Sequence, residues 1–179
     1  NARKQARGTA CLGNLKQSIT YVQMYLDSYQ WSIVGEGDQH YTRSGSLYRA
    51  GMIDTNSTKG INCPEAKKAP SGLTDVELVG KYSFACNYSG MQVVNDTYYV
   101  TAPFRIMLGT NYSALNMKAV KEPSGFLFLA DGRNNSGYAV SKFYPIGAFG
   151  DWGCGPWRGH YNRFNAAWGD GHVSTVDEG

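Results

Sequence analysis

The chain has 179 residues, of which 42% are hydrophobic, 17% are charged and 22 are glycine. This length fits one domain with a substantial core, and aliphatic and aromatic residues recur along the whole chain, which excludes a disordered protein. The net charge is +3, and four of the 17 basic residues fall within the first 16 positions. Because no basic stripe with interleaved aromatic residues follows, we expect no nucleic-acid partner. No apolar run approaches the roughly 18–20 residues that span a bilayer.

The first predicted element is a long amphipathic helix over residues 1–30. Its large apolar side chains recur every three or four positions, at Leu12, Leu15, Ile19, Val22, Leu26 and Tyr29. Such a stripe is typical of a helix that packs one face against other elements. Residues compatible with a helix reach back to Asn1 without a clear N-cap, so we expect the native helix to begin upstream.

The rest of the chain, residues 31–179, is predicted to form loops and an antiparallel sheet. Residues 47–53 suit either a short helix or an extended segment, and 65–72 form a polar connector. We expect strands at residues 81–88, 97–101, 104–108 and 125–130, and a segment at 138–144 that pairs back with the last of these. One helix followed by strands predicts an α+β fold in a single domain, residues 1–179.

The last predicted element is a hairpin that turns at Asp170-Gly171, because glycine readily adopts the positive φ that such turns need. A transition metal bound by His160, Asp170 and His172 is one interpretation of this segment. We favour a structural one, in which Asp170 accepts hydrogen bonds from the turn and His160 bonds to nearby groups. A hydrolase that uses Cys154 with His160 is a weaker alternative, so we expect no catalytic residue.

Two further kinds of site depend on side-chain type. Asp131 and Asn134 in one turn, with Asp151 in a glycine-rich loop, offer oxygen atoms that could bind calcium, and plain turns are the alternative. The four cysteines show no C-x-x-C spacing, which argues against a structural zinc site. Cys63 and Cys86 enclose 22 residues and are the preferred disulfide pair, although cysteines can also serve as small buried apolar residues.

Three segments of the chain resemble a known family. Residues 2–25 resemble the segment just after the membrane helix of bacterial type IV pilin-like proteins and type II secretion pseudopilins. His160, nine intervening residues and Asp170-Gly171 resemble the H-x9-D-G signature of the prepilin-processing-associated group. Cys63-Pro64 and the segment 81–87 resemble the central Cys-Pro of that group and the aromatic strand that follows it.

The resemblance implies a pilin-like fold, with a long helix packed on an antiparallel sheet. It implies a non-enzymatic structural subunit of a type IV pilus-like fibre or a type II secretion pseudopilus, processed as a prepilin. Its location would be the bacterial inner membrane and periplasm or the cell surface, and its partners would be copies of itself, other pseudopilins and the assembly machinery. The contact with the inner membrane would be made by an apolar helix preceding Asn1. His160, Asp170 and Gly171 are then expected to be structural.

Two other functions remain open from the sequence. One is a cell-surface module that binds glycans or proteins through loops rich in tyrosine, tryptophan and asparagine, such as residues 148–157. The other is a metal-dependent hydrolase centred on His160.

Overall fold

The computed structural model describes residues 2–29, 32–35, 43–56, 60–87, 91–94, 97–100, 105–107, 112–133, 136–140, 142–143, 155–157, 160 and 162–177. The helices are α1 (Ala2–Tyr29), α2 (Arg43–Arg49) and α3 (Asp75–Lys81), with short 3-10 turns η3 (Met117–Ala119) and η4 (Pro123–Gly125). The strands are β1 (Ser32–Gly35), β2 (Ala85–Asn87), β3 (Met91–Val94), β4 (Thr97–Val100), β5 (Arg105–Met107), β6 (Tyr112–Leu115), β7 (Leu127–Ala130), β8 (Gly132–Arg133), β9 (Lys142–Phe143), β10 (Gly155–Pro156), β11 (Arg163–Trp168) and β12 (Val173–Asp177). Within these ranges, no helix combines the length and the apolar character needed to cross a membrane.

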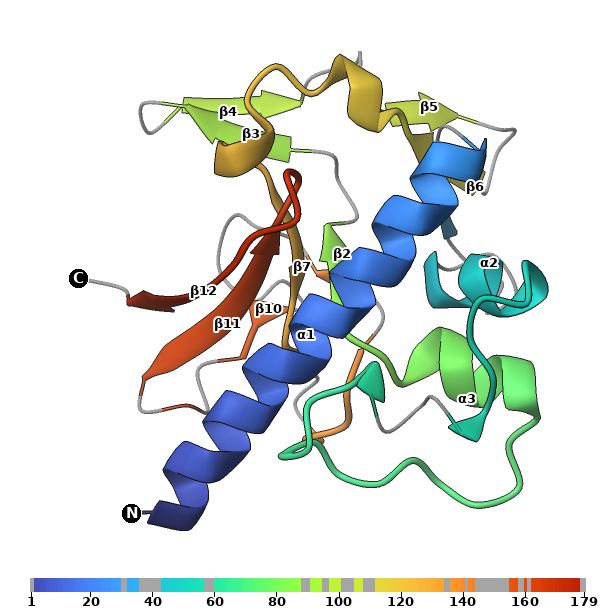
Figure 1. Cartoon of the computed structure of the whole chain (residues 1–179), viewed down its shortest axis with the longest axis vertical. Helices are drawn as coiled ribbons and strands as arrows, with labels where there is room; N and C mark the ends of the chain where they lie inside the picture. Colours follow the sequence, from blue (N-terminus) through green and yellow to red (C-terminus); the bar gives the residue numbers. More distant parts are fainter. Residues whose placement is uncertain are drawn as a thin grey trace.

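The largest sheet has the strand order β12-β11-β7-β2-β9. Its first four strands are antiparallel, and β9 joins the edge in parallel to β2. Helix α1 crosses this sheet along β11, β12 and β7, and α2 and α3 lie on the other side of the helix (Figure 1). Smaller antiparallel sheets are formed by β1-β6-β5, by β3-β4 and by β10-β8. The α+β class predicted from the sequence is confirmed.

The buried face of α1 differs from the predicted stripe. The buried residues of the helix are Cys11, Leu15, Ser18, Ile19, Val22 and Tyr25. Tyr29 is half exposed, and Leu12 and Leu26 lie at the margin of the contact. The buried positions recur at alternating intervals of four and three residues, at Cys11, Leu15, Ser18, Val22 and Tyr25. The helix therefore turns Cys11, Ser18 and Tyr25 toward the core. The predicted stripe consists of large apolar residues and omits Cys11 and Ser18, so the predicted face differs from the buried one.

The segment before β2 also differs from prediction. Residues 81–88 were expected to form one strand, but α3 ends at Lys81 and β2 begins only at Ala85. A capping box begins α3: Thr74 Oγ1 accepts a hydrogen bond from the Glu77 N–H at 3.4 Å, and the Thr74 N–H donates to Glu77 Oε2 at 2.9 Å. The Thr-x-x-Glu spacing that marks such a helix start is present in the sequence.

The other predicted strands are found with shorter limits. β4, β5 and β7 fall inside the segments 97–101, 104–108 and 125–130, and the final hairpin is β11-β12. The expected pairing of the segment 138–144 with 125–130 is not found in its described residues: Ala139 forms an antiparallel bridge with Arg133, and the Val140 N–H donates to the Gly132 carbonyl, both in β8. Its later part forms β9, which lies beside β2 rather than β7.

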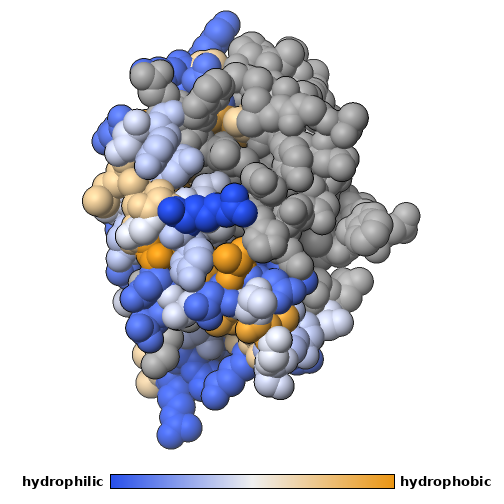
Figure 2. Space-filling view, turned by 90° about the vertical axis from the view of Figure 1, so that its right-hand side faces the viewer, coloured by the Kyte–Doolittle hydropathy of each residue, from blue (hydrophilic) through white to orange (hydrophobic). Residues whose placement is uncertain are grey.

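The surface beside α2 and α3 is mainly polar where the structure describes it. Figure 2 shows this face, on which hydrophilic side chains predominate and apolar ones form small separate patches. Among the described residues, the large apolar side chains left exposed are Met24 and Tyr29, both on α1. In the part of the chain that the structure describes, the large exposed apolar side chains therefore lie on α1.

Candidate functional site: a buried cluster of two cysteines, an aspartate and a histidine

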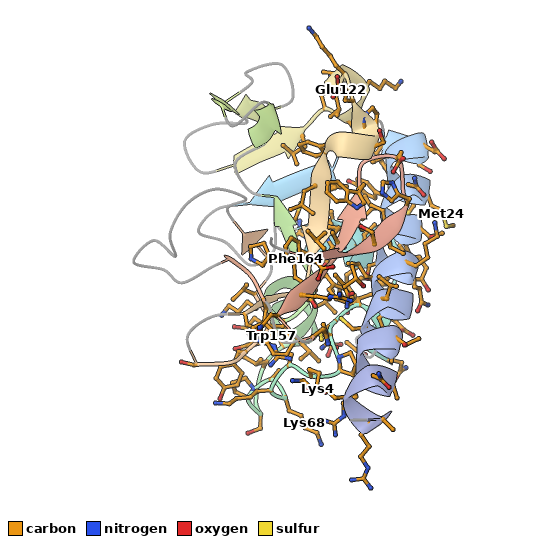
Figure 3. All side chains as sticks on the ribbon, turned by 90° about the vertical axis from the view of Figure 1, so that its left-hand side faces the viewer. Lys4, Met24, Lys68, Glu122, Trp157 and Phe164 are labelled. Carbon is orange, nitrogen blue, oxygen red and sulfur yellow. The ribbon has the colours of Figure 1, made fainter. Side chains whose placement is uncertain are left out.

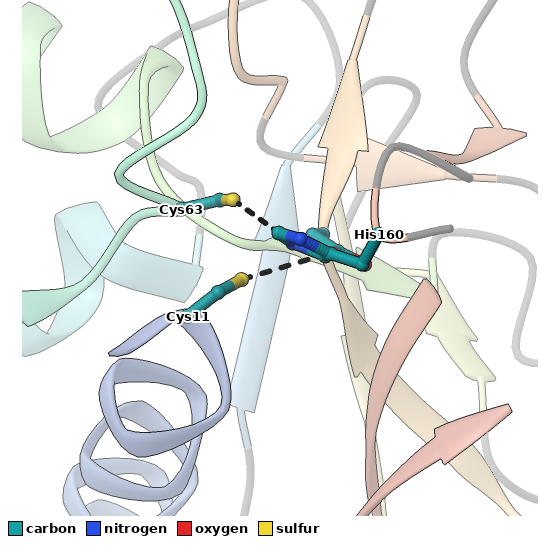
Figure 4. A group of neighbouring side chains, drawn as sticks. Cys11, Cys63 and His160 are labelled. Atoms are coloured by element: carbon teal, nitrogen blue, oxygen red, sulfur yellow. Dashed lines mark hydrogen bonds and ion pairs between the residues drawn. The ribbon is translucent and has the colours of Figure 1, made fainter. Parts of the chain in front are cut away.

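Four side chains with chemical potential meet beneath α1: Cys11, Cys63, Asp131 and His160. The two sulfur atoms, one carboxylate oxygen and one imidazole nitrogen all lie within 4.8 Å of one another. Figure 4 shows Cys11, Cys63 and His160 converging from separate segments. None of the four residues is more than 5% exposed, so the cluster lies inside the protein.

Each member is positioned by regular structure or a tight turn. Cys11 lies on the buried face of α1, and Cys63 begins a turn closed by the Ala66 N–H, which donates to its carbonyl at 2.9 Å. Asp131 directly follows β7. His160 sits in a turn before β11, where its backbone exchanges hydrogen bonds with Arg163, and Asn162 in this turn has φ +63°. The sheet and helix thus bring the four residues together.

The closest contacts in the cluster join the Asp131 carboxylate, the His160 imidazole and the two cysteine thiols. Asp131 Oδ2 is 3.1 Å from His160 Nε2 and 3.5 Å from Cys11 Sγ. Cys63 Sγ is 3.4 Å from the same His160 Nε2. The other carboxylate oxygen, Asp131 Oδ1, accepts a hydrogen bond from the Asn165 N–H at 2.9 Å, which fixes the carboxylate to β11.

The charges of these groups are strongly coupled. The hydrogen bond from Cys11 lowers the pKa of Cys63 to about 5 against the effect of burial. The same hydrogen bond, together with burial, raises the pKa of Cys11 well above its usual value. Burial alone would lower the pKa of His160, but its hydrogen bonds with Asp131 and Cys63 raise it to about 9. Burial raises the pKa of Asp131. The directions of these shifts favour a proton on Cys11 and on His160 over one on Cys63.

Arg133 and Trp157 cover one side of the cluster. The Arg133 guanidinium lies 3.2 Å from the centre of the Trp157 ring, and its Nη2 is 4.0 Å from Cys63 Sγ. The Trp157 ring meets the His160 ring edge-on at 5.2 Å between centroids. Trp157 comes from the loop that we considered for ligand binding, but its half-buried ring packs on the cluster. Trp152 of the same loop lies outside the described residues.

The arrangement does not match a cysteine–histidine–aspartate triad. In a triad, one imidazole nitrogen takes the proton of the nucleophile while the carboxylate binds the other nitrogen. Here Cys63 and Asp131 both contact Nε2 of His160, so no relay runs through the ring. Four donor atoms that face one point instead suit a structural link or a metal ion.

Comparisons of this chain with protein-family models, with curated proteins and with solved structures found no match.

The histidine and the Asp-Gly pair of the H-x9-D-G signature lie in different parts of the structure. His160 belongs to the cluster, where it contacts Asp131 and Cys63 rather than the hairpin. Asp170 lies in the exposed turn, where Oδ1 accepts a hydrogen bond from the His172 N–H at 3.1 Å and lies 2.6 Å from His172 Nδ1. The described residues that gather as possible metal ligands do not include Asp170 or His172. The trio of His160, Asp170 and His172 is thus not assembled.

The predicted disulfide between Cys63 and Cys86 is not formed. Cys63 faces α1 and His160. Cys86 is on β2 in the middle of the sheet, where burial raises its pKa to about 12 and the nearby Arg43 opposes the rise. The two sulfur atoms therefore belong to different environments, which spacing along the chain does not reveal.

The predicted calcium ligands are only partly within the described structure. Asn134 and Asp151 lie outside the described residues. The Asp131 carboxylate is directed to an imidazole, a thiol and a backbone N–H. Calcium prefers a cage of oxygen atoms, so the surroundings of Asp131 do not fit that ion.

Sequence reasoning missed the cluster because its members are far apart in the chain. Cys11 and Asp131 are 120 positions apart, and Cys63 and His160 are 97 apart. One available signal was Cys11 itself, a cysteine that falls on the inner face of the helix once the apolar pattern is extended to include it.

A substitution at Gly171 tests whether the Asp170-Gly171 turn stabilises the fold. The φ of Gly171 is +87°, and a Cβ there would meet the side-chain amide of Gln23 on α1. Gly171→Ala is expected to lower the free energy of unfolding by about 1–2 kcal/mol, mainly because alanine disfavours this backbone conformation. Urea denaturation measures the change.

Gly13→Ala is the matched control, because no heavy atom lies within 4 Å of a Cβ at this helical position. This substitution is expected to raise stability by up to about 1 kcal/mol. Equal stability of Gly171→Ala and the wild type would show that the turn tolerates a side chain.

Proposed function

We propose that this chain is the head domain of a non-enzymatic subunit of a type IV pilus-like fibre or a type II secretion pseudopilus. The observation that supports this most is the arrangement of α1. One face of this 28-residue helix packs on the antiparallel sheet, while its first turns extend past the sheet edge (Figure 1). The resemblance of residues 2–25 and of His160, Asp170 and Gly171 to the prepilin-processing-associated group agrees with this proposal.

The exposed side of α1 offers a surface for contact between subunits. Met24 and Tyr29 are 53% and 50% exposed on this helix. Met24 points away from the sheet (Figure 3). Apolar side chains exposed on one element are suited to packing against a second copy of that element, because burial would remove them from water. A second copy of the chain is therefore the partner we propose for this side of the helix.

The binding-module and hydrolase alternatives have less support. Trp157, from the loop considered for ligand binding, packs on the cluster with Arg133. The shared use of His160 Nε2 by Cys63 and Asp131 argues against a thiol nucleophile. The geometry thus favours a structural protein.

The proposal is tested by changing Met24 in cells that produce the protein from its own gene. Met24→Lys is expected to reduce the amount of this protein in filaments sheared from the cells, because a charge would replace an apolar contact. Immunogold electron microscopy and the protein content of the sheared fraction measure the change. The stability of the head domain should shift by no more than about 0.5 kcal/mol, since the position is exposed.

Met24→Leu is the matched control, because it keeps an apolar side chain at the same position, and it should assemble as the wild type does. A wild-type protein absent from every filament would refute the proposed function. Undiminished assembly of Met24→Lys would refute the proposed subunit contact.

A further inference from the structure

We propose that Cys11, Cys63, Asp131 and His160 form a zinc-binding site that joins α1 to the sheet. Two thiol sulfurs, one imidazole nitrogen and one carboxylate oxygen are all donors that zinc accepts in proteins. The four donor atoms lie within 4.8 Å of one another, and their side chains are buried. The site comes from four separated parts of the chain and goes beyond the proposed role in a fibre.

The distances between donors fit a tetrahedral ion. With Zn–S bonds of about 2.3 Å and Zn–N or Zn–O bonds of about 2.0–2.2 Å, neighbouring donors in a tetrahedron are separated by about 3.3–3.8 Å. The three measured separations are 3.1 Å from Asp131 Oδ2 to His160 Nε2, 3.4 Å from Cys63 Sγ to His160 Nε2 and 3.5 Å from Cys11 Sγ to Asp131 Oδ2. These three separations lie within a few tenths of an ångström of the tetrahedral range, and the other pairs of donors lie within 4.8 Å of each other.

The orientation of the side chains also fits metal binding. Cys63 and Asp131 both approach Nε2 of His160, the nitrogen that would coordinate the ion. Asp131 turns Oδ2 to the cluster, while Oδ1 is held by the Asn165 N–H. Hydrogen bonds from outside the ligand set commonly orient metal ligands in this way.

The charge balance supports the same assignment. Two thiolates, one carboxylate and a neutral imidazole around Zn²⁺ would leave one negative charge in a buried site. The Arg133 guanidinium, whose Nη2 is 4.0 Å from Cys63 Sγ, supplies the compensating positive charge. Zinc binds cysteine as the thiolate and histidine through a nitrogen without a proton, so binding would release protons to solvent.

Four protein ligands leave no open position, so the site would be structural rather than catalytic. A disulfide between Cys11 and Cys63 would use only the two sulfur atoms and would not account for the convergence of Asp131 and His160. Zinc engages all four groups and links α1, the Cys63 turn, the end of β7 and the segment before β11.

The proposal is tested on the wild-type chain, purified under reducing conditions, stripped of metal with a chelator and titrated with zinc chloride. We expect one zinc ion per chain by elemental analysis and a higher melting temperature for the loaded protein. X-ray absorption spectroscopy of that sample should show two sulfur ligands at about 2.3 Å and two nitrogen or oxygen ligands at about 2.0–2.2 Å.

Variants identify the ligands. Cys63→Ser is expected to weaken zinc binding by more than the roughly 10–100-fold that loss of an outer-shell partner causes. Cys86→Ala is the matched control, since Cys86 is a buried cysteine outside the cluster, and it should bind zinc within a few-fold of the wild type.

Failure of the reduced wild-type chain to take up zinc would overturn the proposal, as would a spectrum with fewer than two sulfur ligands. Wild-type affinity in Cys63→Ser would do the same. The first two measurements need no variant, so misfolding of a substituted chain cannot decide the result. Filament assembly is scored separately, so failure of the zinc site and failure of the proposed function are distinguishable.

Discussion

Replacing Asp131 by alanine is expected to lower the free energy of unfolding by about 3–5 kcal/mol, the usual cost of removing one partner from a buried ion pair. The carboxylate is 1% exposed and contacts His160, Cys11 and the Asn165 N–H. Its removal leaves Nε2 of the buried imidazole and a backbone N–H without this partner inside the protein. Urea denaturation in the presence of a chelator measures this cost free of any contribution from a bound metal.

Asp170→Ala is the control for the Asp131 experiment. Asp170 also contacts a histidine, at 2.6 Å, but both side chains are more than a third exposed. Solvent screens such a pair, so the expected loss is no more than about 1 kcal/mol. Equal costs for the two substitutions would contradict the importance assigned to burial at Asp131.

Replacing Leu15 by alanine is expected to lower the free energy of unfolding by about 2–5 kcal/mol. Leu15 is fully buried on the face of α1 that packs into the core, which includes Ile19, Phe126 and Phe128. Truncation removes apolar contacts and leaves a cavity. The helix cannot move in to fill this cavity, because its other buried side chains hold it in place. The change is read from urea denaturation.

Met24→Ala on the same helix is the matched control. Met24 is 53% exposed and points away from the sheet (Figure 3), so its truncation should change stability by no more than about 0.5 kcal/mol. If Leu15→Ala cost as little as Met24→Ala, the packing of α1 on the sheet would not contribute to folding as proposed.

Much of the secondary structure follows from local patterns in the chain. The period of apolar residues predicted α1, and Asp170-Gly171 predicted the turn between β11 and β12. These predictions hold because helix periodicity and the positive φ of Gly171 are properties of a few neighbouring residues. The start of α3 is equally local, and the Thr74-x-x-Glu77 spacing would have predicted it.

The sequence by itself therefore determined the long helix, the closing hairpin and the α+β class. Only the tertiary structure decided which face of α1 is buried, that Cys63 lies near Cys11 rather than being bonded to Cys86, and that His160 pairs with Asp131 rather than Asp170. The physical reason is that these contacts join residues up to 120 positions apart, and no local spacing encodes them. They are set by how α1 lies across β7 and β11.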